Sequence, residues 1–166
     1  MIKYGLLTAD DEWASEYEVY DFLYALVRLL KPKVILETGC YKGGATFQMA
    51  KAADVNLVAL WTCDTSEQMI DEARRKIPRA WLASEIVRLE LMNGCDLCAM
   101  VKDVDLAFID SSGDRVAEVQ ALNLAPNGVV VLHDAKRPQY QAIKTLRPWK
   151  AIWEIDTVQG ITVFQS

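Results

Sequence analysis

Apolar residues follow two different spacings along the chain, and the two kinds of segment alternate. Residues 16–30, "EYEVYDFLYALVRLL", repeat apolar positions at helical spacing, and residues 33–38, "KVILET", form the short continuous apolar run typical of a buried strand. The alternation continues to the C-terminus. Further strands are expected at 56–63, 85–92, 104–110, 151–158 and 160–166, and a turn followed by the fifth strand is expected at 126–134. Further helices are expected at 45–53, 66–77, 95–102, 114–124 and 138–146.

This order of elements predicts an α/β fold. The first five strands are each followed by a helix, and the last two are separated by "QG" at 159–160, which is typical of a hairpin. We therefore expect a Rossmann-like open sheet of seven strands, five mainly parallel plus a C-terminal antiparallel hairpin, with helices on both faces. No linker or repeat divides the chain, so residues 1–166 are expected to form a single domain. In such sheets ligands bind beyond the carboxyl ends of the strands.

Composition narrows the functional classes. The chain of 166 residues has a net charge of −5, which argues against nucleic-acid binding because that needs a positive surface. It has no apolar run approaching the length of about 18 residues that a membrane span needs. The N-terminal residues "MIKYGLLTADDEWASEYEVYD" lack the apolar core of a signal peptide, so a cytoplasmic location is expected.

One segment departs from the acidic average. Residues 135–150 carry five basic residues and no acid, namely Lys136, Arg137, Lys144, Arg147 and Lys150. A solvated helix face is the usual explanation of such a run. The alternative is an anion-binding surface, because this segment follows the fifth strand and borders the expected ligand side of the sheet.

The glycine-rich stretch "ILETGCYKGGAT" (35–46) follows the first strand and constrains the ligand. Tyr41 stands at the middle position of the dinucleotide fingerprint, where a glycine must let the backbone meet the pyrophosphate. Acidic residues end the first, second and fourth strands, namely Glu37, Asp64 and Asp110. Together they suit a cationic ligand with a ribose diol and would repel a pyrophosphate. S-adenosylmethionine has this chemistry, with a sulfonium, an ammonium and a diol but no phosphate.

Four segments in order resemble the motifs of class I S-adenosylmethionine-dependent methyltransferases, especially the small O-methyltransferase-like members. They are "ETGCYKGGAT", "VDLAFIDSS", "LAPNGVVVLHD" and the closing "GITVFQ". Ala45 stands where the first motif usually has Ser or Thr. The resemblance covers almost the whole chain, and it implies a helix within residues 1–30 that covers the cleft.

The resemblance also implies a cofactor site. Its residues would be Glu37, Gly39, Tyr41 and Gly43 after the first strand, Asp64 on the ribose, Gly94, Cys95 and Asp96 against the adenine, and Asp110 near the methionine moiety. In catechol-type relatives two aspartates and an asparagine hold Mg²⁺ at the reacting end. Asp110 and Asp134 match the aspartates, but Ala135 replaces the asparagine. Two carboxylates with waters can still hold Mg²⁺.

His133 is the only histidine of the chain, and two roles stay open for it. Its ordinary pKa suits a general base, and a structural ring bonded to a neighbouring group explains its position equally well. With Asp110 and Asp134 it forms the expected catalytic group.

These observations predict transfer of a methyl group to an oxygen atom of a small-molecule acceptor. If the basic segment binds the acceptor, the acceptor is expected to be anionic. The alternative is a non-catalytic module of the same fold that binds S-adenosylmethionine or a partner protein. No cap is inserted between the fifth strand and the hairpin, so a homo-oligomer is a further expectation, because a second subunit could complete the acceptor site.

Overall fold

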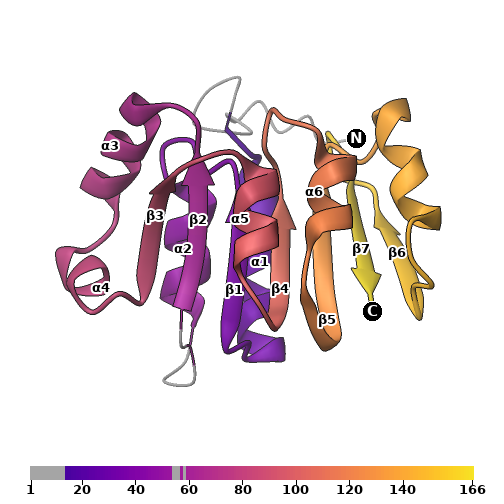
Figure 1. The fold of residues 1–166 in the computed structure, drawn as a ribbon, viewed down its shortest axis with the longest axis horizontal. Helices are drawn as coiled ribbons and strands as arrows, with labels where there is room; N and C mark the ends of the chain where they lie inside the picture. The colour runs from indigo at the N-terminus through magenta and orange to yellow at the C-terminus, as the bar shows by residue number, and fades with distance from the viewer. Residues whose placement is uncertain (1–13, 54–56, 58) are drawn as a thin grey trace, which may run out of the picture.

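Seven strands form one sheet in the order β3-β2-β1-β4-β5-β7-β6 in a computed structural model that describes residues 14–53, 57 and 59–166 (Figure 1). The strands are β1 (Val34–Thr38), β2 (Ala59–Asp64), β3 (Val87–Leu91), β4 (Val104–Ile109), β5 (Leu124–His133), β6 (Ala151–Ile155) and β7 (Ile161–Gln165). β1 to β5 are parallel, and β7 runs antiparallel between β5 and β6. The expected fold class is confirmed.

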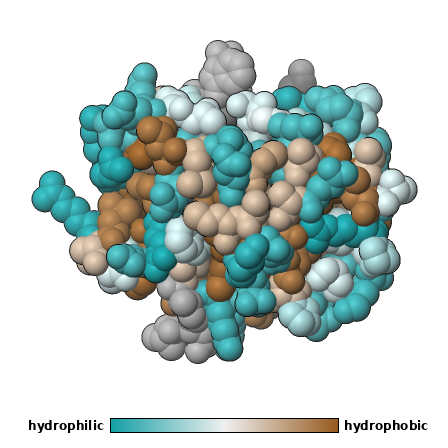
Figure 2. All heavy atoms as spheres, viewed as in Figure 1, coloured by the Kyte–Doolittle hydropathy of each residue, from teal (hydrophilic) through white to brown (hydrophobic). Residues whose placement is uncertain are grey.

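The helices connect the strands. They are α1 (Tyr17–Leu30), α2 (Gly44–Ala52), α3 (Glu67–Lys76), α4 (Arg79–Ala83), α5 (Gly94–Met100), α6 (Arg115–Ala121) and the 3₁₀ helix η1 (Pro138–Thr145). On the face that carries α5 and α6, hydrophobic side chains show between hydrophilic ones (Figure 2). No helix in the described ranges has the length and apolar character that a bilayer crossing requires.

The central strands are apolar throughout because helices cover both faces of the sheet. In β4, Leu106 and Phe108 pack into the core beneath α1 and α2, whereas Ala107 and Ile109 pack beneath α5 and α6. Successive side chains of a strand point to opposite faces, so a strand covered on both sides needs apolar residues at every position. The continuous apolar runs of the sequence are explained in this way.

The structure differs from the expected elements in three places. The helix α4 was not expected, and the basic segment after β5 forms a 3₁₀ helix. β5 begins at Leu124, because Leu124 pairs with Val104 before the expected turn. Asn127 still has the left-handed conformation of a turn residue (φ 63°), and the register with β4 shifts there. Residues 1–13 of the predicted N-terminal cover, and residues 56 and 58 of the second expected strand, lie outside the described residues. The single domain stays a prediction.

The segment before α1 reaches the edge of the sheet at which the parallel strands end. Ser15 Oγ donates a hydrogen bond of 2.8 Å to Asp110 Oδ2, just beyond β4. The helix α1 then packs beside α2. This arrangement brings the start of the described chain over the ends of β1, β4 and β5, where ligands bind in this class of sheet.

Candidate functional site

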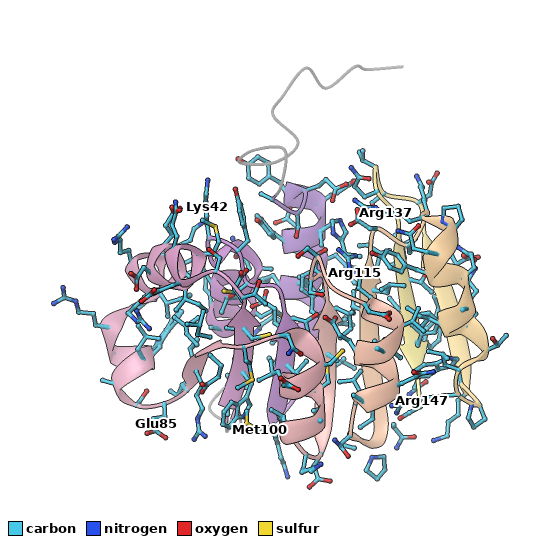
Figure 3. All side chains as sticks on the ribbon, turned by 45° about the horizontal axis from the view of Figure 1, so that its top comes forward. Lys42, Glu85, Met100, Arg115, Arg137 and Arg147 are labelled. Atoms are coloured by element: carbon cyan, nitrogen blue, oxygen red, sulfur yellow. The ribbon has the colours of Figure 1, made fainter. Side chains whose placement is uncertain are left out.

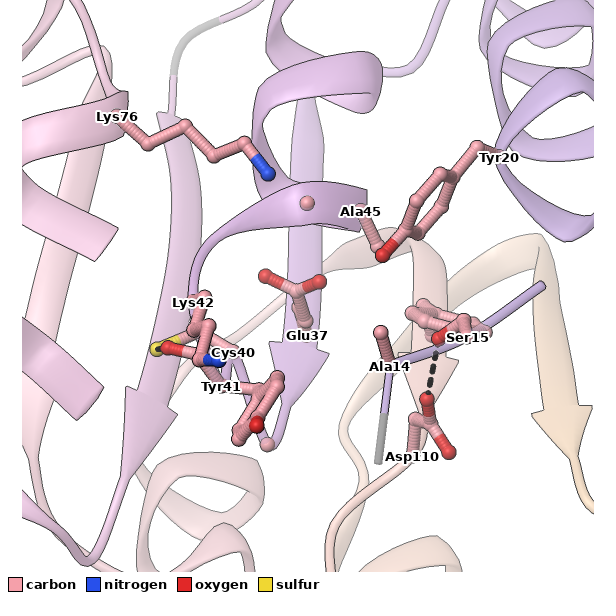
Figure 4. A pocket seen from close by; sticks show the side chains of 13 residues that line it. Ala14, Ser15, Tyr20, Glu37, Cys40, Tyr41, Lys42, Ala45, Lys76 and Asp110 are labelled. Carbon is pink, nitrogen blue, oxygen red and sulfur yellow. Dashed lines mark hydrogen bonds between the residues drawn. The ribbon is translucent and has the colours of Figure 1, made fainter. Parts of the chain in front are cut away.

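A cleft runs along the carboxyl ends of β1, β2, β4 and β5. It consists of one hollow of about 290 Å³ and one of about 390 Å³, and Gly39, Asp64 and Ser112 line both. A third, smaller space of about 50 Å³ adjoins them at Gly39 and lies over Glu37 (Figure 4). The ends of the strands therefore enclose a continuous surface long enough for a nucleoside and an attached chain.

The glycine loop after β1 is shaped by its contacts with other strands. Gly39 has φ +80°, and a Cβ there would lie 2.7 Å from Ser111 Cα, so only glycine lets the loop lie against the end of β4. Tyr41 also has a left-handed backbone (φ 47°), and its N–H donates to Asp64 Oδ2 at 3.1 Å. The Ser66 N–H donates to the other oxygen of Asp64 at 2.9 Å. The loops after β1 and β2 thus fix Asp64 at the cleft.

Glu37 is fully buried at the end of β1 and one of its oxygens has no partner. Thr46 and Thr62 donate their hydroxyl hydrogens to Oε2, the second at 2.6 Å. In the described part of the chain, Oε1 accepts no hydrogen bond. Burial raises the pKa of Glu37 to about 7, and the negative charges of Asp110 and Asp64 add to this effect. Such an oxygen beside a small hollow suits the ammonium group of a ligand.

His133 lies between two carboxylates at the end of β5. Its Nδ1 is 2.8 Å from Asp110 Oδ1 and its Nε2 is 2.7 Å from Glu16 Oε2. Burial lowers the pKa of His133, but these two carboxylates raise it further, to about 10. A ring that donates from both nitrogens has no lone pair for an acceptor's proton. Of the two roles left open, the geometry favours the structural one.

Arg115, the first residue of α6, joins Asp110 to Asp134. Its Nη2 lies 3.1 Å from Asp110 Oδ1 and 3.1 Å from Asp134 Oδ2. Its Nη1 donates to the backbone carbonyl of His133 at 2.8 Å, and its Nε to that of Ser111 at 2.6 Å. The side chain is only 4% exposed. The guanidinium therefore ties the ends of β4 and β5 together beneath the cleft.

Asp134 lines the larger hollow, and one of its oxygens has no partner among the described residues. Its Oδ2 accepts a hydrogen bond from Arg115 and forms an ion pair with Arg137, each at 3.1 Å. Its Oδ1 accepts no hydrogen bond from any described residue, and Asp134 lines the hollow together with Arg137. The backbone of Asp134 is left-handed (φ 54°), a conformation that non-glycine residues rarely adopt and that often marks functional sites.

The expected Mg²⁺ ligands are close together but do not fit the ion. Among the described residues, Asp110, His133 and Asp134 are the only group whose possible ligand atoms lie together, within 4.8 Å of one another. Both ring nitrogens of His133 contact carboxylates, and the Arg115 guanidinium bridges the two aspartates. A cationic side chain therefore stands between the two aspartates, where a metal ion that joined them would lie.

The hollow of about 290 Å³ contains part of the predicted adenine site. Gly94 and Cys95 line it, but Asp96 does not, because its carboxylate accepts from Asn93 Nδ2 at 2.7 Å. Glu118 lines it instead, accepting hydrogen bonds from the hydroxyls of Ser111 and Thr38. Gly94 is required here, since a Cβ would overlap the Glu118 carboxylate.

Residues 36–135, more than half of the chain, match a family described as a methyltransferase domain. The chain belongs to this methyltransferase family. It is a class I S-adenosylmethionine-dependent methyltransferase, as its motifs indicated. Nothing in the match supports the alternative of a non-catalytic module. No curated protein sequence matches the methyltransferase.

Solved structures share the fold of the methyltransferase at low sequence identity. A methyltransferase from Geobacter sulfurreducens is 19% identical with a TM-score of 0.75, over 95% of this chain and 80% of that one. The O-methyltransferase TomG from Streptomyces achromogenes, in complex with SAM, is 19% identical with a TM-score of 0.74, over 96% and 92%. An O-methyltransferase from Bacillus cereus, in complex with SAH, is 20% identical with a TM-score of 0.74, over 94% and 84%.

The structure brings most of the predicted site residues to the cleft of the methyltransferase. Glu37 lines the smallest of the three hollows. The two larger hollows are lined by eight predicted residues, namely Gly39, Tyr41, Asp64, Gly94, Cys95, Asp110, His133 and Asp134. Gly43 does not line them; its φ of +75° shapes the turn into α2. Three residues of the site, Glu16, Arg115 and Glu118, were not expected from the sequence.

Two of the missed residues carried a signal in the sequence. Arg115 and Glu118 fall at the helical spacing of the buried face of α6, where charged residues are unusual. Arg115 also begins the helix, although the helix dipole favours acidic residues in the first turn. Glu16 carried no comparable signal, because it stands among the other acidic residues of positions 10–21, where solvated carboxylates are usual.

Proposed function

We propose that this methyltransferase transfers the methyl group of S-adenosylmethionine to a hydroxyl oxygen of a small anionic acceptor. The observation that carries the proposal is Asp134, which lines the larger hollow beside Arg137 and whose Oδ1 has no partner among the described residues. An oxygen nucleophile needs a group that receives its proton, and an anionic acceptor needs a cation. Both groups stand at the end of β5.

The cofactor residues follow from the shape and charge of the cleft. Glu37 Oε1 would pair with the ammonium of the methionine moiety, and Asp64 would accept the ribose hydroxyls. The hollow between Gly94, Cys95 and Glu118 would hold the adenine, with the Gly39 and Tyr41 backbone alongside. When bound, S-adenosylmethionine supplies a methyl group already activated by its sulfonium.

The residues of this chain would orient the acceptor. Asp134 Oδ1 would accept a hydrogen bond from the acceptor hydroxyl and hold its proton, while Arg137, 52% exposed, would pair with the acceptor's negative group. Asp110 is less suited to that proton, since Ser15, Arg115 and His133 already contact its two oxygens. Lys136 lies apart, paired with Asp156 at 2.7 Å.

Calorimetric titration with S-adenosylhomocysteine tests the cofactor part. We expect saturable binding that Asp64→Ala weakens at least about tenfold, because each charge-assisted hydrogen bond contributes about 1.5–3 kcal/mol. Glu72→Ala, which removes a half-buried carboxylate on α3 outside the cleft, is the matched control and should bind normally. No binding by the folded wild-type protein would contradict the proposal.

The acceptor part is tested by methyl transfer to a panel of anionic and neutral hydroxyl compounds. We expect turnover on anionic members, and loss of turnover with unchanged cofactor binding in Asp134→Asn. Transfer to amines or thiols in place of hydroxyl compounds would refute the assignment to oxygen.

A further inference from the structure

We infer that the Arg115 guanidinium is a built-in substitute for a divalent cation: it holds Asp110 and Asp134 together, and the site excludes Mg²⁺. The exclusion of the metal stands on the geometry of these three side chains alone. The further statement that Arg115 thereby orients Asp134 toward the acceptor rests on the proposed function.

The position of one nitrogen carries this inference. Arg115 Nη2 lies 3.1 Å from an oxygen of each aspartate, Asp110 Oδ1 and Asp134 Oδ2. These are hydrogen-bond lengths, whereas Mg²⁺ needs oxygens at about 2.1 Å in a near-octahedral arrangement. An ion bound between these two oxygens would need the place of the nitrogen, so it could enter there only if the guanidinium left. An ion bound through Asp134 Oδ1 instead would lie beside the positive charges of Arg115 and Arg137, which repel it.

Other contacts prevent the guanidinium from leaving. Its remaining donors bond the backbone carbonyls of Ser111 and His133, and its charged group lies 5.0 Å from the ring centre of Tyr140. The side chain is 4% exposed, and the arginine charge is permanent. Displacement would leave a buried cation and two carbonyls without partners, which is a heavy cost in free energy.

The charges around Asp134 are also balanced without a metal. Arg115 and Arg137 both pair with the same oxygen, Oδ2, and both come from the edge of the sheet at which the cleft lies (Figure 3). The carboxylate is therefore held by two cations through one oxygen, and its Oδ1 has no partner among the described residues. A metal ion bound by both carboxylates would have the same effect as the two arginines, because it would hold one carboxylate oxygen in position for the acceptor. Arg115 is thus a positioning residue, acting through Asp134.

Mn²⁺ alone is the probe for the test, since it has ligand preferences similar to those of Mg²⁺ and its electron paramagnetic resonance signal reports the bound fraction. The protein is titrated without cofactor or acceptor. We expect no stoichiometric binding to wild type. Arg115→Ala should gain Mn²⁺ affinity by at least about tenfold, because Asp110 and Asp134 lose their cation. The double variant Arg115→Ala, Asp134→Asn should lose that gain.

Arg147→Ala is the matched control. Arg147 also bonds backbone carbonyls, those of Val119, Gln120 and Leu122, but it lies away from the cleft and contacts no described carboxylate (Figure 3). Its replacement should leave Mn²⁺ affinity at the wild-type level. A merely structural arginine at position 115 would give this same result, so an Arg115→Ala variant that folds without gaining affinity overturns the inference.

The wild-type titration decides the question even if Arg115→Ala does not fold. Stoichiometric Mn²⁺ binding to wild type that Asp134→Asn abolishes would overturn the inference, and its absence supports it. Failure of S-adenosylhomocysteine to bind would instead contradict the proposed function. The two failures are distinguishable because the Mn²⁺ experiment contains no cofactor.

Discussion

Glu16 Oε2 lies 2.7 Å from His133 Nε2, and this contact joins residues that are 117 positions apart. The partners belong to the segment before α1 and to the last residue of β5. The other oxygen of Glu16 accepts the backbone N–H of Gln159 at 2.9 Å. One buried carboxylate therefore fastens the start of the described chain to two elements of the C-terminal half.

Replacement of Glu16 tests whether this contact stabilises the fold. We expect Glu16→Gln to lower the free energy of unfolding by about 2 kcal/mol, because it leaves the charged His133 ring without one of its two buried anionic partners. The measurement is urea unfolding at neutral pH. Glu18→Gln is the control, since Glu18 is exposed and bonds only the backbone N–H of Val158, and its effect should stay below about 0.5 kcal/mol.

The fold could be predicted because the decisive pattern is local. Continuous apolar runs such as 33–38 occur only where helices cover both faces, and their alternation with helical segments leaves few topologies. The short helix α4 was missed because it has no fully buried residue and therefore no apolar periodicity. The topology predicted that the site lies at the carboxyl ends of the parallel strands. Four acidic residues were therefore correctly expected at that edge, namely Glu37, Asp64, Asp110 and Asp134.

The contacts between those residues could not be predicted. The sequence offered Asp110, His133 and Asp134 as a reacting group, but their partners, Glu16 and Arg115, come from other elements. Arg115 reaches from the start of α6 to the ends of β4 and β5, and no periodic pattern in the sequence indicates which residues such a side chain contacts. For the same reason Asp96 was assigned to the adenine site and Glu118 was overlooked. Of these two residues, Glu118 and not Asp96 lines the hollow of about 290 Å³.

The pH dependence of cofactor binding should follow Glu37. Its pKa is raised to about 7 in the free protein, so below that pH the carboxyl is protonated and cannot pair with an ammonium. We expect affinity for S-adenosylhomocysteine to rise about tenfold from about pH 6 to about pH 8, as the carboxylate forms. Calorimetric titration across this range measures it. Glu37→Gln should bind weakly with a flat profile; a flat profile in wild type would contradict the role of Glu37.

Gly94 tests the adenine end of the cleft. A Cβ at this position would overlap the Glu118 carboxylate, whose neighbours Ser111 and Thr38 hold it in place. We expect Gly94→Ala to weaken S-adenosylhomocysteine binding by about tenfold or more, because either Glu118 or α5 must move into the hollow. Met100→Ala is the control, since Met100 lies on the same helix, α5, but is exposed and does not line the hollow. Equal effects of the two variants would argue against an adenine site here.

Charge reversal separates the two neighbouring basic residues after β5. Arg137 lines the larger hollow, whereas Lys136 pairs with Asp156 and bonds the Thr157 carbonyl at 2.5 Å, outside that hollow. With an anionic acceptor identified, we expect Arg137→Glu to raise the acceptor KM by about tenfold, from the loss of one charge-assisted hydrogen bond. Lys136→Glu should leave the acceptor KM near the wild-type value. If both variants raised it equally, the effect would come from the overall field of the basic segment rather than from a contact with Arg137.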